Sequence, residues 1–552
     1  MNQNQPFEKN YFFAIALSAL VLFTYFALVK PPQAPAPAAE EAKPAFSEKA
    51  SVPAEATEEA GAFSAKKAEV LPTSAAALFK LETKTMLAEF SDRGATLTQL
   101  EFKGESKREH LTQTTFFQGD MDLPGIFSVA IRGQAEHLTH STFKLMSKTE
   151  NEAVYAYEEP GAFRLTKKFQ LSSDAPALQL SIDIENLSAR EKTYPLEFIY
   201  GADYHALGGH PKPGEYFDAM VFANGLKTAN TGKIEKKGFW VSEPAAWTAL
   251  VKSYFALIVR PDQKIISTRA EARDGKVMMS NHLDPLTVAP GSRETVRFKI
   301  YAGPQRYETL KSFEDGFQAV LSRGFFGAPK VWLLLILKFL HQFTHNFGWD
   351  ILLLTFLIKL VFAPLTLISS KSMKKMQLLS PKQKAIQEKY KKDPQRAQKE
   401  IMELYKRNKV NPISGCLPML IQLPILIGMF RLLPEAIELH GAPFIFWIQD
   451  LSAQDQFMQL PFKIPFLGEW LNILPFLMVA SQIGYQKMMP QTMSMPEQQM
   501  IMNIMPFFFG FICWSFPSGL VLYWIFQNLF SMLQQVFINR IQTELHPEDR
   551  DK

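Results

Sequence analysis

The 552-residue chain has only two cysteines, Cys416 and Cys513. Both lie in apolar runs, and the polar region over residues 31–330 has none. That region must therefore fold without disulfide bonds, which excludes the class of small secreted domains stapled by such bridges. We expect both cysteines to be small, buried and unreactive side chains.

Charged residues are missing from residues 11–29 and from residues 498–539. An apolar run of about 20 residues is long enough to cross a bilayer. The first run is longer than the core of a signal peptide, and Lys9 is the only basic residue before it. We therefore expect an uncleaved transmembrane anchor over residues 1–30, although the small residues of PAPAA at 35–39 would also suit cleavage.

The second uncharged run belongs to a mostly apolar half of the chain, residues 347–539. The mean hydropathy of the whole chain, −0.06, hides the contrast between this half and the polar residues before it. Hydropathy predicts five spans in the apolar half. They lie at about 347–369, 413–433, 464–484, 499–516 and 519–538. The FPSG sequence at 516–519 supplies a turn between the last two.

The polar half divides into a linker and a domain. Residues 31–71 are rich in Pro, Ala and Glu, which is typical of a flexible linker. Short runs of alternating apolar and polar residues follow, as in ALQLSIDIENLS (177–188) and ETVRFKIYAGP (294–304). Alternation with period two in many short segments predicts a large β-sandwich, which we place at residues 72–315.

This predicted sandwich has no motif for catalysis, a cofactor or a metal. GHPKPG at 209–214 has the glycine spacing of a phosphate loop, but Glu215 stands where that loop needs lysine. The histidines His110, His137, His140, His205 and His210 make no metal-type pair on a predicted helix. The sequence therefore predicts a binding or spacer domain.

A linker and a surface helix lead into the apolar half, over residues 316–346. KVWLLLILKFLHQFTH at 330–345 is apolar but carries two lysines and two histidines. It is short for a span, and we expect an amphipathic helix at the membrane surface.

The basic residues predict the orientation of the spans. Residues 371–409 hold 13 Lys and Arg against four acids, a net charge of +9, so the rest of the chain sums to −4. Basic short loops lie on the cytoplasmic side. Residues 434–463 hold four acids and a single basic side chain and are therefore external. Alternation then places residues 31–346 outside, and the amino terminus and the tail 540–552 inside.

The basic loop predicts a helical hairpin at residues 371–410. Residues 373–391 and 395–409 have helical patterns and are separated at KKDP. Two interpretations stay open: a solvated topology signal, or a platform that attracts ribosomal RNA and anionic lipid. The lysines that would form this platform are Lys374, Lys375, Lys382, Lys384, Lys391 and Lys392.

Lys359 lies near the middle of the first predicted core span. A cation at that depth costs about 2.5–3.5 kcal/mol. The cytoplasmic end of the helix is roughly 18 Å away at about 1.5 Å per residue, too far for the side chain to reach. The acids of the spans, Asp350 and Glu469, lie near external ends. We therefore expect water around Lys359, in a hydrophilic groove that opens to the cytoplasm.

Other polar residues of the spans fit the same groove. They are Thr355, Gln422, Asn503 and Asn528, together with Gln527 at mid-span and Gln482 on the cytoplasmic side. Amides also join helices by hydrogen bonds in membranes, and this interpretation explains them equally well. It does not explain Lys359.

Three blocks of the apolar half resemble signature sequences of the YidC insertase family. They are KVNPISGCLPMLIQLPI (409–425), APFIFWIQDLSAQD (442–455) and FPSGLVLYW (516–524). Their order and spacing match the family, whose core covers about residues 330–540 of this chain. The anchor and the large external domain match the Gram-negative form.

The resemblance implies a multi-domain membrane protein with an α-helical five-helix insertase core at 347–539 and the amino-terminal anchor helix. It implies that the external domain is an all-β periplasmic supersandwich of the galactose-mutarotase type. The groove's basic residue, usually arginine in the family, falls on Lys359, and its threonine on Thr355. Trp524 stands where the family often has a tyrosine that contacts substrate.

The function that the resemblance implies is insertion and chaperoning of inner-membrane proteins, alone or with the SecYEG/SecDF translocon. Nascent chains, ribosomes and the bilayer would be the partners, in the bacterial inner membrane, with no cofactor and no enzymatic reaction. An intramembrane serine protease using Ser518 lacks a base in the spans. A solute transporter is disfavoured because we see no inverted repeats.

Overall fold

The computed structural model describes residues 78–103, 113–118, 125–132, 135–203, 217–252, 254–273, 275–324, 327–391, 393–408, 410, 417–464, 468–489 and 496–545. All of them fall in one compact unit that begins at Ala76. The predicted anchor, the linker 31–71, the GHPKPG sequence and Cys416 lie outside the described residues.

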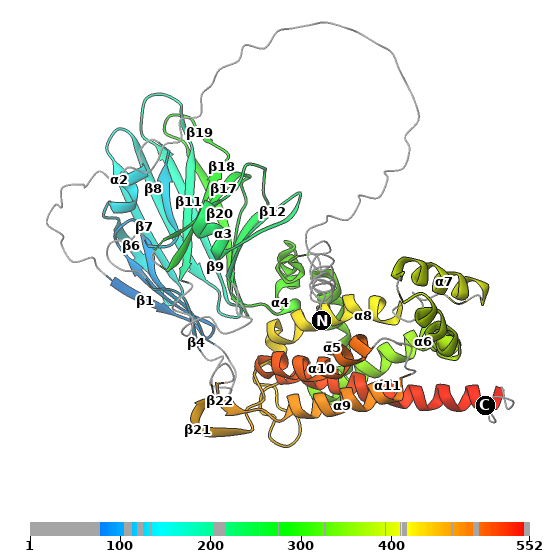
Figure 1. Ribbon diagram of the computed structural model, residues 1–552. Coiled ribbons are helices and arrows are strands. Elements are labelled where there is room, and N and C mark those ends of the chain that lie inside the picture. Colours follow the sequence, from blue (N-terminus) through cyan, green and yellow to red (C-terminus); the bar gives the residue numbers. More distant parts are fainter. Residues whose placement is uncertain are drawn as a thin grey trace, which may run out of the picture. The chain divides into compact units, whose positions relative to one another are not determined.

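Strands make up most of the described chain before residue 305 (Figure 1). They are β1 (Leu78–Glu82), β2 (Met86–Ser91), β3 (Thr96–Lys103), β4 (Gln113–Gln118), β5 (Ser128–Ile131), β6 (Lys144–Lys148), β7 (Glu152–Glu159), β8 (Phe163–Leu171), β9 (Ala177–Asn186), β10 (Lys192–Tyr194), β11 (Leu196–Asp203), β12 (Phe217–Ala223), β13 (Gly225–Asn230), β14 (Phe239–Val241), β15 (Trp247–Lys252), β16 (Phe255–Pro261), β17 (Ile265–Arg273), β18 (Lys276–Leu283), β19 (Leu286–Val288) and β20 (Arg293–Pro304). Two short helices, α2 (Ala135–His140) and α3 (Thr231–Lys237), lie between them.

Three sheets of these strands share one core. The largest runs β13-β12-β15-β16-β20-β9-β8-β7-β6, the second β14-β17-β18-β11-β5 and the third β1-β2-β3-β4. Their strand pairs are antiparallel, and buried residues of all three sheets belong to a single cluster. The prediction of an all-β sandwich is confirmed.

The alternation seen in the sequence sets the register of the large sheet. In β9, Leu178, Leu180, Ile182 and Ile184 are buried. In the neighbouring strand β20, Phe298 lies opposite Leu180 and Val296 opposite Ile182. Because side chains of a strand alternate between its two faces, this register brings the apolar sets of both strands into the same core.

Strand β15 departs from alternation, since all six of its residues are buried. Its second face is covered by α4 (Tyr307–Ser312) and η2 (Phe317–Ser322). Phe317 and Val320 pack there with Trp247, in a cluster separate from the sandwich core. The start of the predicted linker 316–346 is therefore a packed helical turn.

The rest of the described chain is mainly helical. Its elements are α5 (Gly327–Thr344), α6 (Phe347–Lys389), α7 (Pro394–Arg407), α8 (Leu417–Glu435), η4 (Ile437–Leu439), β21 (Met458–Ile464), β22 (Gly468–Leu471), α9 (Leu474–Met488), α10 (Pro496–Ile512), η5 (Cys513–Ser515) and α11 (Ser518–Leu545). Among the residues searched, two helices are long and apolar enough to cross a membrane, Phe347–Lys389 and Ser518–Arg540.

The predicted start of the third span is wrong. Residues 464–484 were expected to be one helix, but α9 begins only at Leu474. The residues before it form the hairpin of β21 and β22, and Gly468 has a φ of 86°. The sequence there is apolar enough to score as a span, but its prolines and this glycine oppose a helix. The turn at FPSG is confirmed, since α11 starts at Ser518.

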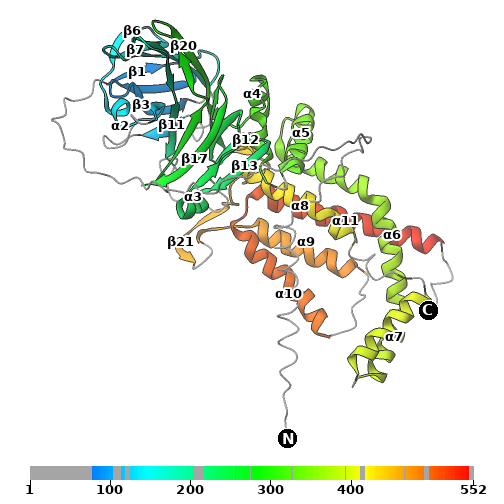
Figure 2. The ribbon, with the colours of Figure 1, turned by 90° about the horizontal axis from the view of Figure 1, so that it is seen from above.

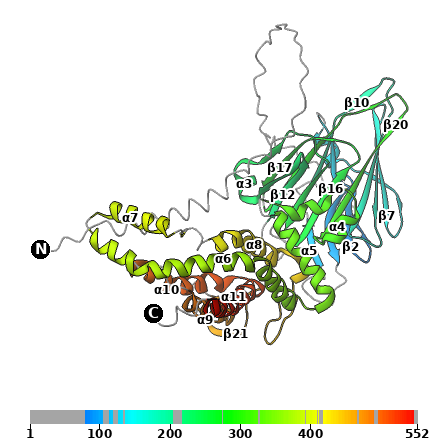
Figure 3. The same cartoon turned by 90° about the vertical axis from the view of Figure 1, so that its right-hand side faces the viewer.

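The helical hairpin is confirmed, with one difference. Its first arm is the end of α6, a single helix of 43 residues. At about 1.5 Å per residue, α6 is roughly 65 Å long, about twice the thickness of the hydrocarbon layer. Figures 2 and 3 show α6 leaving the helical region and α7 folding back beside it. Met376, Leu379 and Val410 form the small core between the arms.

The predicted surface helix is present as α5, but its two stripes differ in exposure and not in polarity, because both are apolar. One stripe is exposed and the other is buried against α6 and α8. The exposed stripe is Trp332, Ile336, Phe339 and Phe343, and the buried one is Leu333, Leu334, Leu337 and Leu340. These spacings of three and four residues each define one face of a helix.

Candidate functional site

Lys359 lies on α6 with a neutral hydrogen-bond partner. Its Nζ donates to Oγ of Ser531 on α11 at 2.7 Å. The Ser531 hydroxyl donates its own proton to the Gln527 carbonyl at 2.6 Å, so its oxygen is left to accept from the lysine. No carboxylate pairs with Lys359 among the described residues.

Gln527 lies on α11, one turn before Ser531, and its side chain has an acceptor without a partner. Its Oε1 is buried and has no hydrogen-bond partner in the described part of the chain. A buried polar atom without a partner costs about 1–3 kcal/mol, and one in lipid several. Lys359 and Gln527 thus leave unused hydrogen-bonding capacity near mid-span, which suits water or a polar guest.

Other predicted groove residues have partners between helices. Asn528 of α11 is buried and donates from Nδ2 to Ser481 Oγ of α9 at 3.0 Å. The half-buried Trp524 donates from Nε1 to Gln482 Oε1, also of α9, at 3.3 Å. These bonds join α11 to α9, as the alternative interpretation of the amides expects.

Three of the predicted residues lie apart from this set or are already satisfied. Thr355 is fully buried, and its hydroxyl donates to the Ile351 carbonyl of its own helix at 2.6 Å. Gln422 is half-buried on α8, and Asn503 is exposed on α10. No hydrogen bond joins Asn503 to Lys359 or Trp524 in the described residues.

The end of the core that we predict to be external, called the external end below, is held by contacts between two of the family-like blocks. The Ser518 hydroxyl donates to the Asp450 carbonyl at 2.6 Å, and the Gly519 N–H donates to the Leu451 carbonyl at 2.9 Å. A Cβ on Gly519 would lie 2.8 Å from the Leu451 oxygen, so only glycine fits here. Ser518 therefore ties a turn to a loop, and its hydroxyl is engaged in that role.

The same loop also fixes the start of α9. Asp455 is buried and accepts from Trp447 Nε1 and from the backbone N–H of Leu474. Asn472 donates from Nδ2 to the Trp514 carbonyl at 2.7 Å. The blocks 442–455 and 516–524 are thus explained by mutual polar contacts that hold the external ends of α9 and α11.

A buried aspartate joins the surface helix to the first core helix. Asp350 of α6 is fully buried and lies 2.7 Å from Nδ1 of His341 on α5. Its other oxygen accepts from the Thr344 hydroxyl. The sequence drew attention to Asp350 as an acid within a span but did not indicate this partner, which lies nine residues earlier across a break at Asn346.

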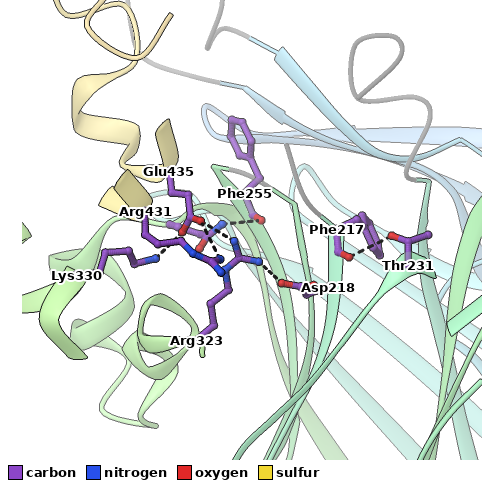
Figure 4. Close-up of polar contacts among 9 residues, drawn as sticks. Phe217, Asp218, Thr231, Phe255, Arg323, Lys330, Arg431 and Glu435 are labelled. Atoms are coloured by element: carbon purple, nitrogen blue, oxygen red, sulfur yellow. Dashed lines mark hydrogen bonds and ion pairs between the residues drawn. The ribbon is translucent and has the colours of Figure 1, made fainter. Parts of the chain in front are cut away.

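A second buried cluster lies where the sandwich meets α5 and α8 (Figure 4). Glu435 accepts from Arg323 at 2.6 Å and from Lys330 at 2.9 Å, and Arg323 also bonds Asp218 of β12. All four side chains are less than 10% exposed. Burial raises the pKa of Asp218, and the charge of Arg323 opposes this shift. Burial lowers the pKa of Lys330, and the charge of Glu435 opposes that shift. Sequence reasoning missed this cluster.

Most of the lysines predicted for the basic hairpin are exposed on its surface. Of those predicted, Lys375, Lys382, Lys384 and Lys391 are exposed and Lys374 is half-buried, while Lys392 lies outside the described residues. The described part of the chain contains no group of His, Cys, Asp and Glu that would hold a metal. Cys513 is free and buried, as predicted.

Two family models cover most of the chain. The model of the 60Kd inner membrane protein matches residues 339–545, and that of the YidC periplasmic domain matches residues 78–336. A membrane protein insertase YidC of Geobacter metallireducens is 30% identical over 97% of this chain and 98% of its own length. That of Endomicrobium trichonymphae is 35% identical over 72% of this chain and 75% of its own length.

A solved structure of an active YidC insertase is 18% identical, with a TM-score of 0.36, and covers 84% of this chain and 92% of that one. The full-length relative at 30% identity, with both models, is sufficient for assignment. The chain belongs to the YidC family of membrane protein insertases, which act on membrane proteins at the bacterial inner membrane.

Proposed function

We propose that this chain inserts its clients through a hydrophilic groove that opens to the cytoplasm and to lipid, with Lys359 inside it. The observation that carries the proposal is the lysine itself. It lies on a helix long enough to cross the membrane and bonds only a neutral hydroxyl in the described residues. A charge held there without an anion needs water or a polar ligand.

The contacts at the end of the core that we assign to the outside support a groove that is closed there. The Ser518 hydroxyl and the Gly519 N–H donate to carbonyls of the loop 442–455, and Asn472 donates to the Trp514 carbonyl. Near Lys359, the Oε1 atom of Gln527 is buried without a hydrogen-bond partner in the described residues. A client's polar flank therefore has a site in mid-membrane, and a closed external end behind it.

The energetics need no nucleotide. Moving about 20 apolar residues of a client into lipid drives the reaction. The barrier is the passage of the polar flank through hydrocarbon, where unsatisfied groups cost several kcal/mol each. A groove with a cation and unpaired amides lowers this barrier, and the client's apolar helix leaves along the boundary with lipid.

The proposal includes an orientation and partners. The amino terminus lies in the cytoplasm, residues 31–346 lie in the periplasm, and the basic hairpin meets ribosomes on the cytoplasmic side. The exposed lysines Lys375, Lys382 and Lys384 support the last point. Cooperation with the SecYEG/SecDF translocon rests on the family resemblance.

Thiol labelling tests the groove. Lys359→Cys, in a background with Cys416 and Cys513 replaced, is expected to react with a charged maleimide added from the cytoplasmic side. The matched control is Val361→Cys, two residues on, since Val361 is 69% exposed on a helix surface that we assign to lipid. A polar reagent is expected to leave that cysteine unmodified.

The groove would be overturned if neither Lys359→Cys nor Gln527→Cys reacted with the reagent. Both would then lie in a dry bundle. Labelling of both by reagent added only from the periplasmic side would overturn the direction.

A further inference from the structure

The surface helix α5 is held at its start by buried charges. Lys330 is in its first turns, and its Nζ donates to Glu435 at 2.9 Å. Glu435 is the last residue of α8 and takes a second bond from Arg323, just before α5. Figure 4 shows both cations converging on this one carboxylate. The network therefore joins α5 to the external end of α8.

The other end of α5 is held by a second buried pair. His341 and Thr344, in its last turn, both bond Asp350 in the first turn of α6. The His341 ring also stacks on Phe347, with ring centroids 3.8 Å apart. The same short helix is thus tied to α8 at one end and to α6 at the other.

Between the two ends, α5 packs closely along α8. A Cβ on Gly428 would lie 2.8 Å from Leu333 Cδ1, so the glycine permits the approach. Leu334 and Leu337 are buried in the same cluster as Met429 and Leu432 of α8. Movement of α5 would therefore open this packing as well as the ion pairs.

The sandwich reaches the network through a separate contact. Arg323 bonds Asp218 of β12, while Lys330 and Glu435 make their bond without the sandwich. Two further contacts join the sandwich to the segment after α8: Ile437 packs in the sandwich core, and the Tyr254 and His440 rings lie 4.6 Å apart. Asp218 is thus a tether, and the pair of Lys330 with Glu435 belongs to the helices.

We propose that Glu435 is a positioning residue for insertion: it fixes the external end of α8 to α5, and so to α6, while Asp218 only moors the sandwich to this joint. This rests on the proposed function, because α6 carries Lys359 and α8 carries Gln422. Buried ion pairs are poor sources of stability compared with apolar packing, but breaking one leaves an uncompensated charge. A device that fixes geometry explains why charges are used here.

The test compares two glutamates of one segment in the full-length protein. Glu435→Gln removes the carboxylate that bonds Arg323 and Lys330 and that lies 3.8 Å from Arg431. The matched control is Glu438→Gln, since the Glu438 carboxylate is buried but has no hydrogen-bond partner among the described residues. Burial raises the pKa of Glu438, and glutamine has nearly the same shape as glutamate. Hydrogen exchange of α5 and insertion of a client into vesicles are measured for both.

Glu435→Gln is expected to speed amide exchange in α5 and at the end of α8, and to slow insertion for every client. Glu438→Gln is expected to match the wild type in both. Lys359 acts through the charge of the client's flank. A loss of insertion that does not depend on this charge would therefore reflect the positioning of the helices and not the groove itself. Unchanged exchange in α5 and unchanged insertion in Glu435→Gln would overturn the proposal.

Three further variants keep the test decisive if Glu435→Gln does not fold. Lys330→Met leaves Glu435 with Arg323 and is expected to slow insertion, and Lys330→Arg is expected to restore it. Asp218→Asn is expected to broaden the spin-label distance between Lys236→Cys on the sandwich and Gln449→Cys on the external loop, with insertion retained. Loss of insertion in Asp218→Asn, with α5 exchange unchanged, would assign the positioning role to the sandwich instead.

Discussion

At the scale of single residues, two lysines of this chain differ in what accepts their hydrogen bonds. Lys167 of β8 is fully buried and donates to three backbone carbonyls, those of Gly94 at 2.8 Å and of Ala95 and Phe127 at 3.0 Å each. An ammonium group has three donors, so Lys167 is satisfied. Lys359 has one acceptor. This contrast separates a lysine that holds a fold together from one with capacity for a ligand.

The role of Lys167 gives a prediction about stability. Lys167→Met keeps the apolar stem but leaves three carbonyls without a donor, each a loss of about 1–3 kcal/mol if no water enters. We expect the free energy of unfolding of the sandwich to fall by about 3 kcal/mol, which pulse proteolysis in urea measures within the full chain. Lys168→Met is the control, because Lys168 is exposed and pairs with Glu152. An equal effect of both substitutions would contradict the role.

At the scale of elements, the sequence predicted those helices, strands and turns that depend on local residue patterns. The alternation in β9 and β20 and the turn at FPSG are as expected. The third span was misplaced because hydropathy scores composition, and the apolar residues before Leu474 form a hairpin instead. Partners such as Arg323 and Glu435, 112 residues apart, leave no periodic signal. They depend on packing between elements, which one sequence does not encode locally.

The contact between the FPSG turn and the loop 442–455 gives a prediction at this scale. Gly519→Ala would place a methyl group 2.8 Å from the Leu451 oxygen, so the loop must move. Overpacking of this kind costs about 1–3 kcal/mol. We expect faster hydrogen exchange in residues 442–455 and at the start of α11. Gly484→Ala serves for comparison, since a Cβ there meets the flexible Met532 side chain at 3.2 Å. Hydrogen exchange at the wild-type rate in Gly519→Ala would show that the contact between the FPSG turn and the loop 442–455 is loose.

At the scale of the whole molecule, the chain combines a helical insertase core with an all-β sandwich. Of the groove residues predicted from sequence, Asn528 and Trp524 bind α9, whereas Lys359 has only the Ser531 hydroxyl among the described residues. Thr355, Gln422 and Asn503 lie apart from these or are satisfied within their own helix. The type of residue and its depth were readable from the sequence. The division between structural and available groups was not, because it depends on which helices face each other.

The independence of the core gives a prediction for this scale. A chain lacking residues 78–304 keeps Arg323, Lys330 and Glu435, and therefore the joint between α5 and α8. We expect it to insert clients at close to the wild-type rate, as measured with vesicles and matched amounts of protein. Adding Glu435→Gln to the deletion is expected to reduce insertion. A deletion that enters the membrane correctly but does not insert clients would show direct participation of the sandwich.

The central claim is that the charge of Lys359 draws the polar flank of a client into the membrane. The most direct measurement compares insertion of two clients that differ only in flank charge, one acidic and one neutral. Lys359→Arg is expected to preserve both rates, because the charge remains. Lys359→Glu is expected to slow the acidic client more than the neutral one, since like charges meet where the dielectric is low. Equal rates for both clients in Lys359→Gln and in Lys359→Glu would contradict the claim and leave Lys359 with hydration of the groove as its role.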